Sequence, residues 1–262
     1  MKVLFSHANG YPPGSYRALI AALEESNISA VIRHEHRPLV THEPAPRFLS
    51  WNAFAFDLIA RVEKNSSEPI WLIGHSMGAS SAILAAAKKP NLFAGVIAID
   101  PVLVPTKIWF WSQLTIRIKP NVPLIVKRAL GRPHRFESEE EAFRFYRGKR
   151  VFADISDAVL ADYVSAGHQN HPDGGICLRF SGAWEACIYR STPYMANALR
   201  ALRCPCLIIA GDHSEVLTSD RLKWAIRKNS GIRSTTLPGT HLVPLEIPED
   251  CAQKALEFIA TI

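Results

Sequence analysis

The segment from residue 70 to residue 80 constrains the fold of this chain more than any other. Residues 70–73 form a short apolar run with isoleucine at both ends, typical of a buried strand and too short for a helix. From Ser80 onward, small residues and Leu84 predict a helix. Between the two lies Gly74-His75-Ser76-Met77-Gly78. We therefore expect a strand that turns directly into a helix at Ser76.

Such a sharp turn holds Ser76 in a strained backbone conformation, and Gly74 and Gly78 leave room for the two elements to approach closely. The serine hydroxyl then stands above the edge of the sheet, beside the positive end of the helix. A glycine-rich turn with an inert serine would share this five-residue pattern. The context of a strand, a turn and a helix favours a nucleophile instead.

Apolar runs and helical patterns alternate over much of the chain. Strands are predicted near residues 3–6, 30–33, 70–73, 95–99, 206–210 and 234–237. Helices are predicted from about residue 15 and over 48–62, 219–229 and 249–259. Strands that alternate with helices imply a parallel sheet covered on both faces. We expect an α/β fold with a mostly parallel sheet of about six strands flanked by helices.

The alternation stops after Pro101. Residues 104 to about 200 contain no comparable buried strand, and helices are predicted from Ser138 and over 157–164. A segment of this length needs structure of its own. We therefore expect an α/β core formed by residues 1–103 and 203–262. A mostly helical cap, residues 104–202, is inserted after the strand that ends at Asp100.

A serine nucleophile needs a base and a group that orients this base. His241 follows the last predicted strand, and loops at the carboxyl ends of parallel strands share one edge of the sheet. We therefore expect His241 beside Ser76. His75 should point away from the site, and His7 should brace its own loop. The histidines expected to be solvated in polar loops are His34, His36, His42, His168 and His171.

Three motifs resemble those of the α/β-hydrolase superfamily of serine esterases and lipases. They are Gly74-His75-Ser76-Met77-Gly78, the loop His7-Ala8-Asn9-Gly10, and Gly239-Thr240-His241 followed by Pro248-Glu249. The resemblance implies an eight-stranded sheet and a triad of serine, acid and histidine. It implies hydrolysis of an ester, lactone, thioester or amide, and a cap in the variable insertion. This chain starts at the strand before the His7 loop, so roughly six strands are expected.

The acid of the triad is open between two loops. The usual family position, the last in a Gly-x-x-Asp pattern, holds Ser214 here, with Glu215 one residue later and Asp212 two earlier. Asp100, at the end of the strand before Pro101, occupies a second position that some family members use. Both loops open on the same edge, so topology does not choose. A rigid strand end orients a histidine better than a loop does, which favours Asp100 over the alternatives Glu215 and Asp212.

The resemblance also implies an oxyanion hole made of two backbone N–H groups. One comes from Met77, at the start of the helix after the serine. The other comes from the loop after the first strand, where one alignment points to Asn9 and another to Tyr11; we favour Asn9. The expected function is hydrolysis of a carboxylic ester or lactone through a Ser76 acyl-enzyme, with His241 as general base. The alternatives are an acyltransferase on the same triad and a low-turnover ligand receptor.

The insertion should determine the substrate. Trp109, Trp184 and Glu185 are candidates for the substrate pocket, together with Phe110, Trp111 and Tyr189. The alternative is that these aromatic residues form the core of the cap, which is the more common role for any single one of them. Residues 107–150 are rich in lysine and arginine, which favours either an anionic partner or a solvated basic face.

The remaining features restrict partners and location. No ligand cluster or phosphate-binding loop is present in the sequence, so we expect no metal and no cofactor. The net charge of +6 comes without a basic repeat, which argues against nucleic acid, and no apolar run is long enough to span a membrane. We expect a small to medium acyl substrate, a monomer or homodimer, and possible contact with a membrane surface. The five cysteines lack a disulfide-like spacing and no signal peptide is evident, so we expect a cytoplasmic protein.

Overall fold

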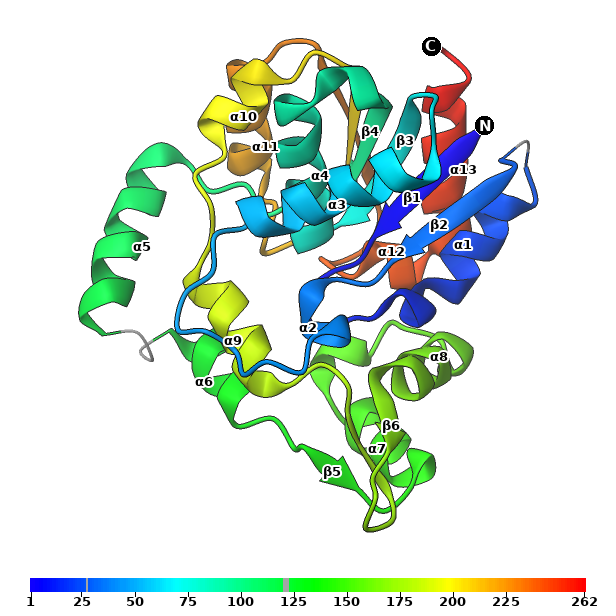
Figure 1. The fold of residues 1–262 in the computed structure, drawn as a ribbon, viewed down its shortest axis with the longest axis vertical. Coiled ribbons are helices and arrows are strands. Elements are labelled where there is room, and N and C mark those ends of the chain that lie inside the picture. Colours follow the sequence, from blue (N-terminus) through cyan, green and yellow to red (C-terminus); the bar gives the residue numbers. More distant parts are fainter. Residues whose placement is uncertain (27, 120–122) are drawn as a thin grey trace.

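The computed structural model describes residues 1–26, 28–119 and 123–262. Its centre is a six-stranded sheet in the order β2-β1-β3-β4-β8-β9, and all its neighbouring strands are parallel (Figure 1). The strands are β1 (Lys2–Ser6), β2 (Ala30–His34), β3 (Ile70–His75), β4 (Phe93–Ile99), β8 (Cys206–Gly211) and β9 (Ile232–Leu237). The expected α/β fold with a mostly parallel sheet of about six strands is confirmed.

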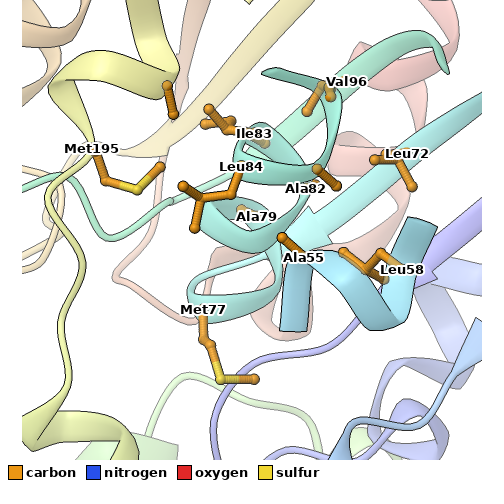
Figure 2. Packing of buried hydrophobic residues seen from close by; sticks show 14 of the residues in the cluster. Ala55, Leu58, Leu72, Met77, Ala79, Ala82, Ile83, Leu84, Val96 and Met195 are labelled. Atoms are coloured by element: carbon orange, nitrogen blue, oxygen red, sulfur yellow. The ribbon is translucent and has the colours of Figure 1, made fainter. Parts of the chain in front are cut away.

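Helices cover both faces of this sheet because successive side chains of a strand point to opposite faces. One face, which carries Leu72 and Val96, packs on α3 (Asn52–Asn65), α4 (Met77–Lys88), α10 (Ala196–Ala201) and α11 (Ser219–Lys228). The other, which carries Ile73 and Ile97, packs on α1 (Arg17–Glu24) and α13 (Pro248–Ile259). Figure 2 shows Ala55 and Leu58 of α3 beside the small residues of α4. Alanines therefore let the helix that follows the serine turn lie close to its neighbours.

Helix α3 begins at Asn52, four residues after the predicted start at Phe48. The Ser50 hydroxyl accepts hydrogen bonds from the backbone and the side chain of Asn52. Serine hydroxyls that bind nearby N–H groups favour a helix start at that point. The shorter helical segments of the chain are η1 (Pro13–Tyr16), α2 (Arg37–Val40), η2 (Pro90–Leu92) and α12 (Val243–Glu246).

The segment between β4 and β8 is mostly helical. It contains α5 (Thr106–Ile118), α6 (Leu124–Leu130), α7 (Glu139–Arg147), η3 (Arg150–Phe152), α8 (Asp157–Gly167), α9 (Gly182–Arg190) and α10. The Ser138 hydroxyl caps α7 by accepting from the Glu141 N–H. A small antiparallel sheet of β5 (Arg135–Phe136), β7 (Ile176–Leu178) and β6 (His168–Asn170) accompanies these helices. Its strands are too short to give a recognisable apolar run.

This inserted segment contacts the core both at the edge where the parallel strands end and on one face of the sheet. Helix α8 packs against η1, in the connection that follows β1, and α10 packs on α4. The division into core and cap at residues 103/104 and 202/203 stays a prediction. Within the described ranges, no helix combines the length and the apolar character needed to cross a membrane.

Candidate active site

Ser76 lies at the junction of β3 and α4 with a backbone conformation that L-residues rarely adopt. Its φ and ψ are 54° and −116°. The turn is tight, because a Cβ atom added at Gly78 would lie 2.1 Å from the carbonyl oxygen of Ser6 on β1. Only glycine fits there, and this explains the spacing of glycine and serine in the sequence. The result is a serine hydroxyl at the carboxyl edge of the sheet.

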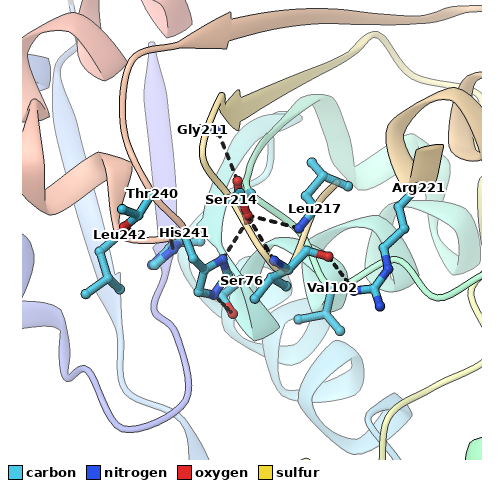
Figure 3. A network of polar contacts seen from close by, with 12 residues as sticks. Ser76, Val102, Gly211, Ser214, Leu217, Arg221, Thr240, His241 and Leu242 are labelled. Atoms are coloured by element: carbon cyan, nitrogen blue, oxygen red, sulfur yellow. Dashed lines mark hydrogen bonds and ion pairs between the residues drawn. The ribbon is translucent and has the colours of Figure 1, made fainter. Parts of the chain in front are cut away.

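Three side chains that follow the ends of three parallel strands meet at this edge, and Figure 3 shows two of them, Ser76 and His241. The Nε2 atom of His241 lies 2.9 Å from the Ser76 hydroxyl, and its Nδ1 atom lies 2.6 Å from Oδ1 of Asp100. An ionised Asp100 can only accept hydrogen bonds, so Nδ1 of a neutral His241 carries the proton and Nε2 accepts from Ser76. This is the arrangement in which a histidine can take the proton of a serine.

Asp100 is fully buried and accepts two further hydrogen bonds. The Gly211 N–H donates to Oδ2 at 3.0 Å, and the Ser214 hydroxyl donates to Oδ1 at 2.7 Å. The two alternative acids lie elsewhere: Glu215 is exposed, and Asp212 accepts a hydrogen bond from the Gly239 N–H at 2.8 Å. Of the three candidates, the structure therefore brings Asp100 to His241.

Ser214 holds this carboxylate and braces its own loop. Its hydroxyl oxygen accepts from the backbone N–H groups of Val216 and Leu217 while its proton goes to Asp100 (Figure 3). Sequence reasoning noted Ser214 only as the absence of an acid. The residue type gave no signal that its hydroxyl reaches the carboxylate from the neighbouring strand.

The expectation that His75 points away from the site is wrong. Its ring lies 5.0 Å from the His241 ring, centroid to centroid, and its Nε2 atom lies 2.8 Å from the His241 backbone oxygen. Its Nδ1 atom lies 2.7 Å from the hydroxyl of Tyr16, which also accepts from the Ala8 N–H. Burial, with His241 as a nearby second titratable group, lowers the pKa of His75 well below its usual value. Neutral His75 therefore donates to the His241 carbonyl and accepts from Tyr16.

Two backbone N–H groups are available for an oxyanion. Within the described part of the chain, the N–H groups of Met77 and Asn9 donate to no protein acceptor. The Tyr11 N–H donates to the Ala8 carbonyl at 3.2 Å, so it is already used. This geometry favours Asn9 over Tyr11 as the second donor. The side-chain nitrogen of Asn9 donates to the Glu185 carbonyl at 3.1 Å, which ties this loop to α9.

An ion pair in the inserted segment lies directly against this loop. Nη1 of Arg132 lies 3.0 Å from Oε2 of Glu185, and both side chains are less than 15% exposed. A Cβ atom added at Gly10 would lie 3.4 Å from either partner. Arg132 also donates to the hydroxyls of Tyr146 and Tyr163. Burial opposes its charge, but Tyr163 and Glu185 raise the pKa of Arg132 well above its ordinary value.

Of the predicted pocket residues, Glu185 thus lies beside the loop that carries Asn9. The Tyr189 hydroxyl donates to Oε1 of Glu185 at 3.3 Å. Trp184 is buried in the core, where its indole N–H donates to the Glu43 carbonyl. Trp109 lines a groove of about 790 Å³ between α3, α4 and α5. Among the described residues that line this groove, none is Ser76, His241 or Asp100. The structure does not bring Trp109 or Trp184 into a polar contact with any of these three residues.

Three histidines expected to be solvated are buried, namely His34, His36 and His168. His36 packs edge-on against the rings of His7, His34 and Phe54, and its Nε2 atom lies 3.0 Å from the Ser6 hydroxyl. As expected, His7 braces its loop by binding the Ala8 carbonyl at 2.8 Å. Within the described ranges, no group of three histidine, cysteine or acidic side chains is arranged to hold a metal ion.

Comparison with known proteins agrees with this picture. Residues 3–254 match the model of a family described as the alpha/beta hydrolase family. Over 107 residues the chain is 31% identical to the monoglyceride lipase of Homo sapiens, a match that covers 39% of this chain and only 35% of that enzyme. Over 221 residues it is 24% identical to the 2-(acetamidomethylene)succinate hydrolase of Mesorhizobium japonicum, covering 78% of this chain and 69% of the relative.

Solved structures show the same fold. The crystal structure of E-2-(acetamidomethylene)succinate hydrolase superposes with a TM-score of 0.83 at 22% identity, covering 99% of this chain and 91% of that one. The enol-lactonase from Burkholderia xenovorans LB400 superposes with a TM-score of 0.68 at 15% identity and the same coverage. At such identities the likeness concerns the fold alone. Because the family model spans nearly all of the sequence, this chain belongs to the alpha/beta hydrolase family.

Proposed function

We propose that this chain is a serine hydrolase of the carboxylesterase or lipase type, which cleaves a carboxylic ester or lactone. The observation that carries the proposal is the continuous line of hydrogen bonds from the Ser76 hydroxyl through His241 to Asp100. Ser76 is the nucleophile in this proposal, His241 the general base and Asp100 the group that orients it. No metal and no cofactor takes part.

The reaction would proceed in two halves. Nε2 of His241 takes the Ser76 proton as Oγ attacks the carbonyl carbon, and the N–H groups of Met77 and Asn9 receive the oxyanion. Donors in this role are each worth about 3 kcal/mol of barrier. His241 then gives its proton to the leaving oxygen, which departs. Water attacks the acyl-enzyme with the same histidine as base, and this step releases the acid and restores Ser76.

The names of the relatives support a carbonyl substrate without choosing among substrates. They include a monoglyceride lipase, a 2-(acetamidomethylene)succinate hydrolase and an enol-lactonase. A small to medium acyl compound is the substrate class that we propose. An acyltransferase would use the same groups, but none of the observed contacts favours an alcohol over water as the acceptor.

The test is hydrolysis of short and medium p-nitrophenyl esters by the wild type and by four variants. Ser76→Ala and His241→Ala should abolish turnover. Asp100→Asn should lower kcat/KM by about 10⁴-fold, because His241 would be held in the wrong tautomer. Glu215→Gln, at an exposed carboxylate of the same sheet edge, is the matched control and should retain wild-type rates.

A fluorophosphonate probe separates two kinds of failure. If the wild type is inert on every ester but Ser76 is labelled, the nucleophile is competent and the substrate class is wrong. If it neither hydrolyses esters nor reacts with the probe, the proposed triad fails and a ligand receptor becomes the better hypothesis.

We also propose a cytoplasmic location. All five cysteines are free, and Cys177, Cys187, Cys206 and Cys251 are buried. Free thiols persist in reducing compartments, whereas oxidising ones favour disulfides. Fractionation of the native host, with the protein detected by antibody, tests this location.

A further inference from the structure

Helix α5 exposes large apolar side chains instead of burying them. It stands apart from the sheet and from the helices that cover it (Figure 1). The structure describes all thirteen of its residues, and Ile116 alone is buried. Phe110, Trp111 and Ile118 are 61%, 65% and 68% exposed. Exposed apolar patches of this kind mark interaction sites.

These exposed side chains form one stripe along the helix. Phe110, Leu114 and Ile118 follow one another at intervals of four residues, and Trp111 lies beside them. Residues at such spacing share a helix face. Trp109, Gln113 and Arg117 line the groove toward α3 and α4, so the stripe lies on the outer side of α5. We call Phe110, Trp111, Leu114 and Ile118 the outer stripe.

The surroundings of the outer stripe are cationic. Between Asp100 and Glu137 the sequence contains no acidic residue. The same stretch contains Lys107, Arg117, Lys119, Lys127, Arg128, Arg132 and Arg135. Among these, the exposed cations of α5, its C-terminus and α6 are Lys107, Arg117, Lys119, Lys127 and Arg128. An apolar stripe on a segment that carries several cations and no acidic residue complements a partner that is apolar inside and anionic at its surface.

The size of the stripe favours a lipid surface over a second protein. The outer stripe offers four side chains of one helix, far fewer than the roughly 20–30 residues per partner of a stable protein interface. A stable protein interface buries about 800 Å² per partner. Helices with tryptophan and phenylalanine on one side and basic residues beside them lie in the boundary between headgroups and acyl chains.

We propose that α5 is the surface by which this chain binds reversibly to anionic lipid membranes. The outer stripe enters the acyl boundary, and Lys107 and Lys119 bind lipid phosphates. This inference rests on exposure and charge alone, and it holds whether or not the chain hydrolyses esters.

The test is flotation of the full chain with vesicles of phosphatidylcholine, with and without about 30% phosphatidylglycerol. The wild type should float with the anionic vesicles and dissociate when salt is raised, because the electrostatic part of binding is screened. F110S/W111S should lose at least tenfold in partitioning. K107Q/K119Q should lose about 25-fold, since each basic residue near such a surface is worth about fivefold.

The matched control is V40S/F56S, which removes two apolar side chains that are equally exposed but lie on α2 and α3. This variant should bind like the wild type. Circular dichroism and melting temperature verify that all variants fold. Equal flotation by F110S/W111S and the wild type would overturn the proposal. So would a wild-type dimer that ignores vesicles and that F110S/W111S converts to monomer, since α5 would then be a protein interface.

Discussion

Ser214 and His241 bind the same oxygen of Asp100. The Ser214 hydroxyl lies 2.7 Å from Oδ1 and Nδ1 of His241 lies 2.6 Å from it, while the Gly211 N–H binds Oδ2 at 3.0 Å. Both oxygens of the carboxylate are thereby held by hydrogen bonds. Ser214 occupies the position where the family usually carries its acid. The loop that carries Ser214 is thus connected to His241 by hydrogen bonds through Asp100.

Ser214→Ala should lower kcat by about ten- to a hundredfold on the ester that the wild type hydrolyses best. The variant removes a hydrogen bond to a charged group, typically worth about 1.5–3 kcal/mol, and frees the carboxylate to rotate away from His241. Steady-state kinetics with kcat and KM measured separately provide the check. A rise in KM with unchanged kcat would mean that Ser214 does not orient the carboxylate.

An exchange of the two residues sharpens this prediction. Asp100→Ser alone should be nearly inactive, and Asp100→Ser combined with Ser214→Asp should recover at least tenfold of the lost rate, because a carboxylate returns to a loop that reaches the same point. No recovery, in a double variant that melts like the wild type, would show that the strand position itself is required.

The fold could be read from the sequence because its four central strands, β1, β3, β4 and β8, are largely buried on both faces and stand out as apolar runs. Ser76 and His241 could be placed at one edge because parallel strands end on the same side. The choice of Asp100 over Glu215 depended on a stated preference for a rigid strand end. Only the side-chain geometry distinguishes the two residues: Asp100 lies 2.6 Å from His241, whereas the Glu215 carboxylate is exposed.

Other features could not be predicted because they depend on tertiary contacts. The orientation of the His75 ring is decided by Tyr16, which is distant in sequence. The burial of His36 is decided by its packing against Phe54, on a different helix. Trp109 and Trp184 are aromatic residues of the same inserted segment, yet one lines a groove and the other packs in the core.

His75→Phe should lower kcat by about tenfold. The ring would still fill the space, but the hydrogen bond that holds the His241 backbone carbonyl at 2.8 Å would be lost. A typical neutral hydrogen bond is worth about 0.5–1.5 kcal/mol, and a buried carbonyl left without a partner costs more. The matched control is His168→Phe, at a buried histidine bonded to the Val164 carbonyl in the inserted segment. If the melting temperature falls by the same amount in both variants and kcat is unchanged in both, His75 contributes to stability only.

The stability of the fold should fall as the pH is lowered from 7 to 5. Burial lowers the pKa of His7 to about 3 and that of His34 to about 4, and it lowers the pKa of His36 well below 6.5. In the unfolded chain these groups take up protons near pH 6.5, so the unfolded state binds more protons and gains free energy as pH falls. At pH 5 each histidine that stays neutral in the fold lowers the free energy of unfolding by about 2 kcal/mol relative to neutral pH.

Urea unfolding at several pH values checks this. The loss should begin below pH 6.5 and grow until the folded-state pKa values are reached, and His34→Asn should make it shallower. An equal unfolding midpoint at pH 7 and pH 5 would contradict the assignment of neutral, buried rings.

Arg132→Met and Glu185→Gln should each destabilise the fold by about 3–5 kcal/mol, because each leaves a buried group of the pair without its partner. Their side chains are 12% and 14% exposed and lie against Gly10 in the loop that carries Asn9. The double variant should lose clearly less than the sum of the single losses, because no uncompensated charge remains. Urea denaturation of the four proteins provides this double-mutant cycle. Additive losses would mean that Arg132 and Glu185 do not interact with each other. The inserted segment would then be held to the Asn9 loop mainly by the tyrosines around Arg132.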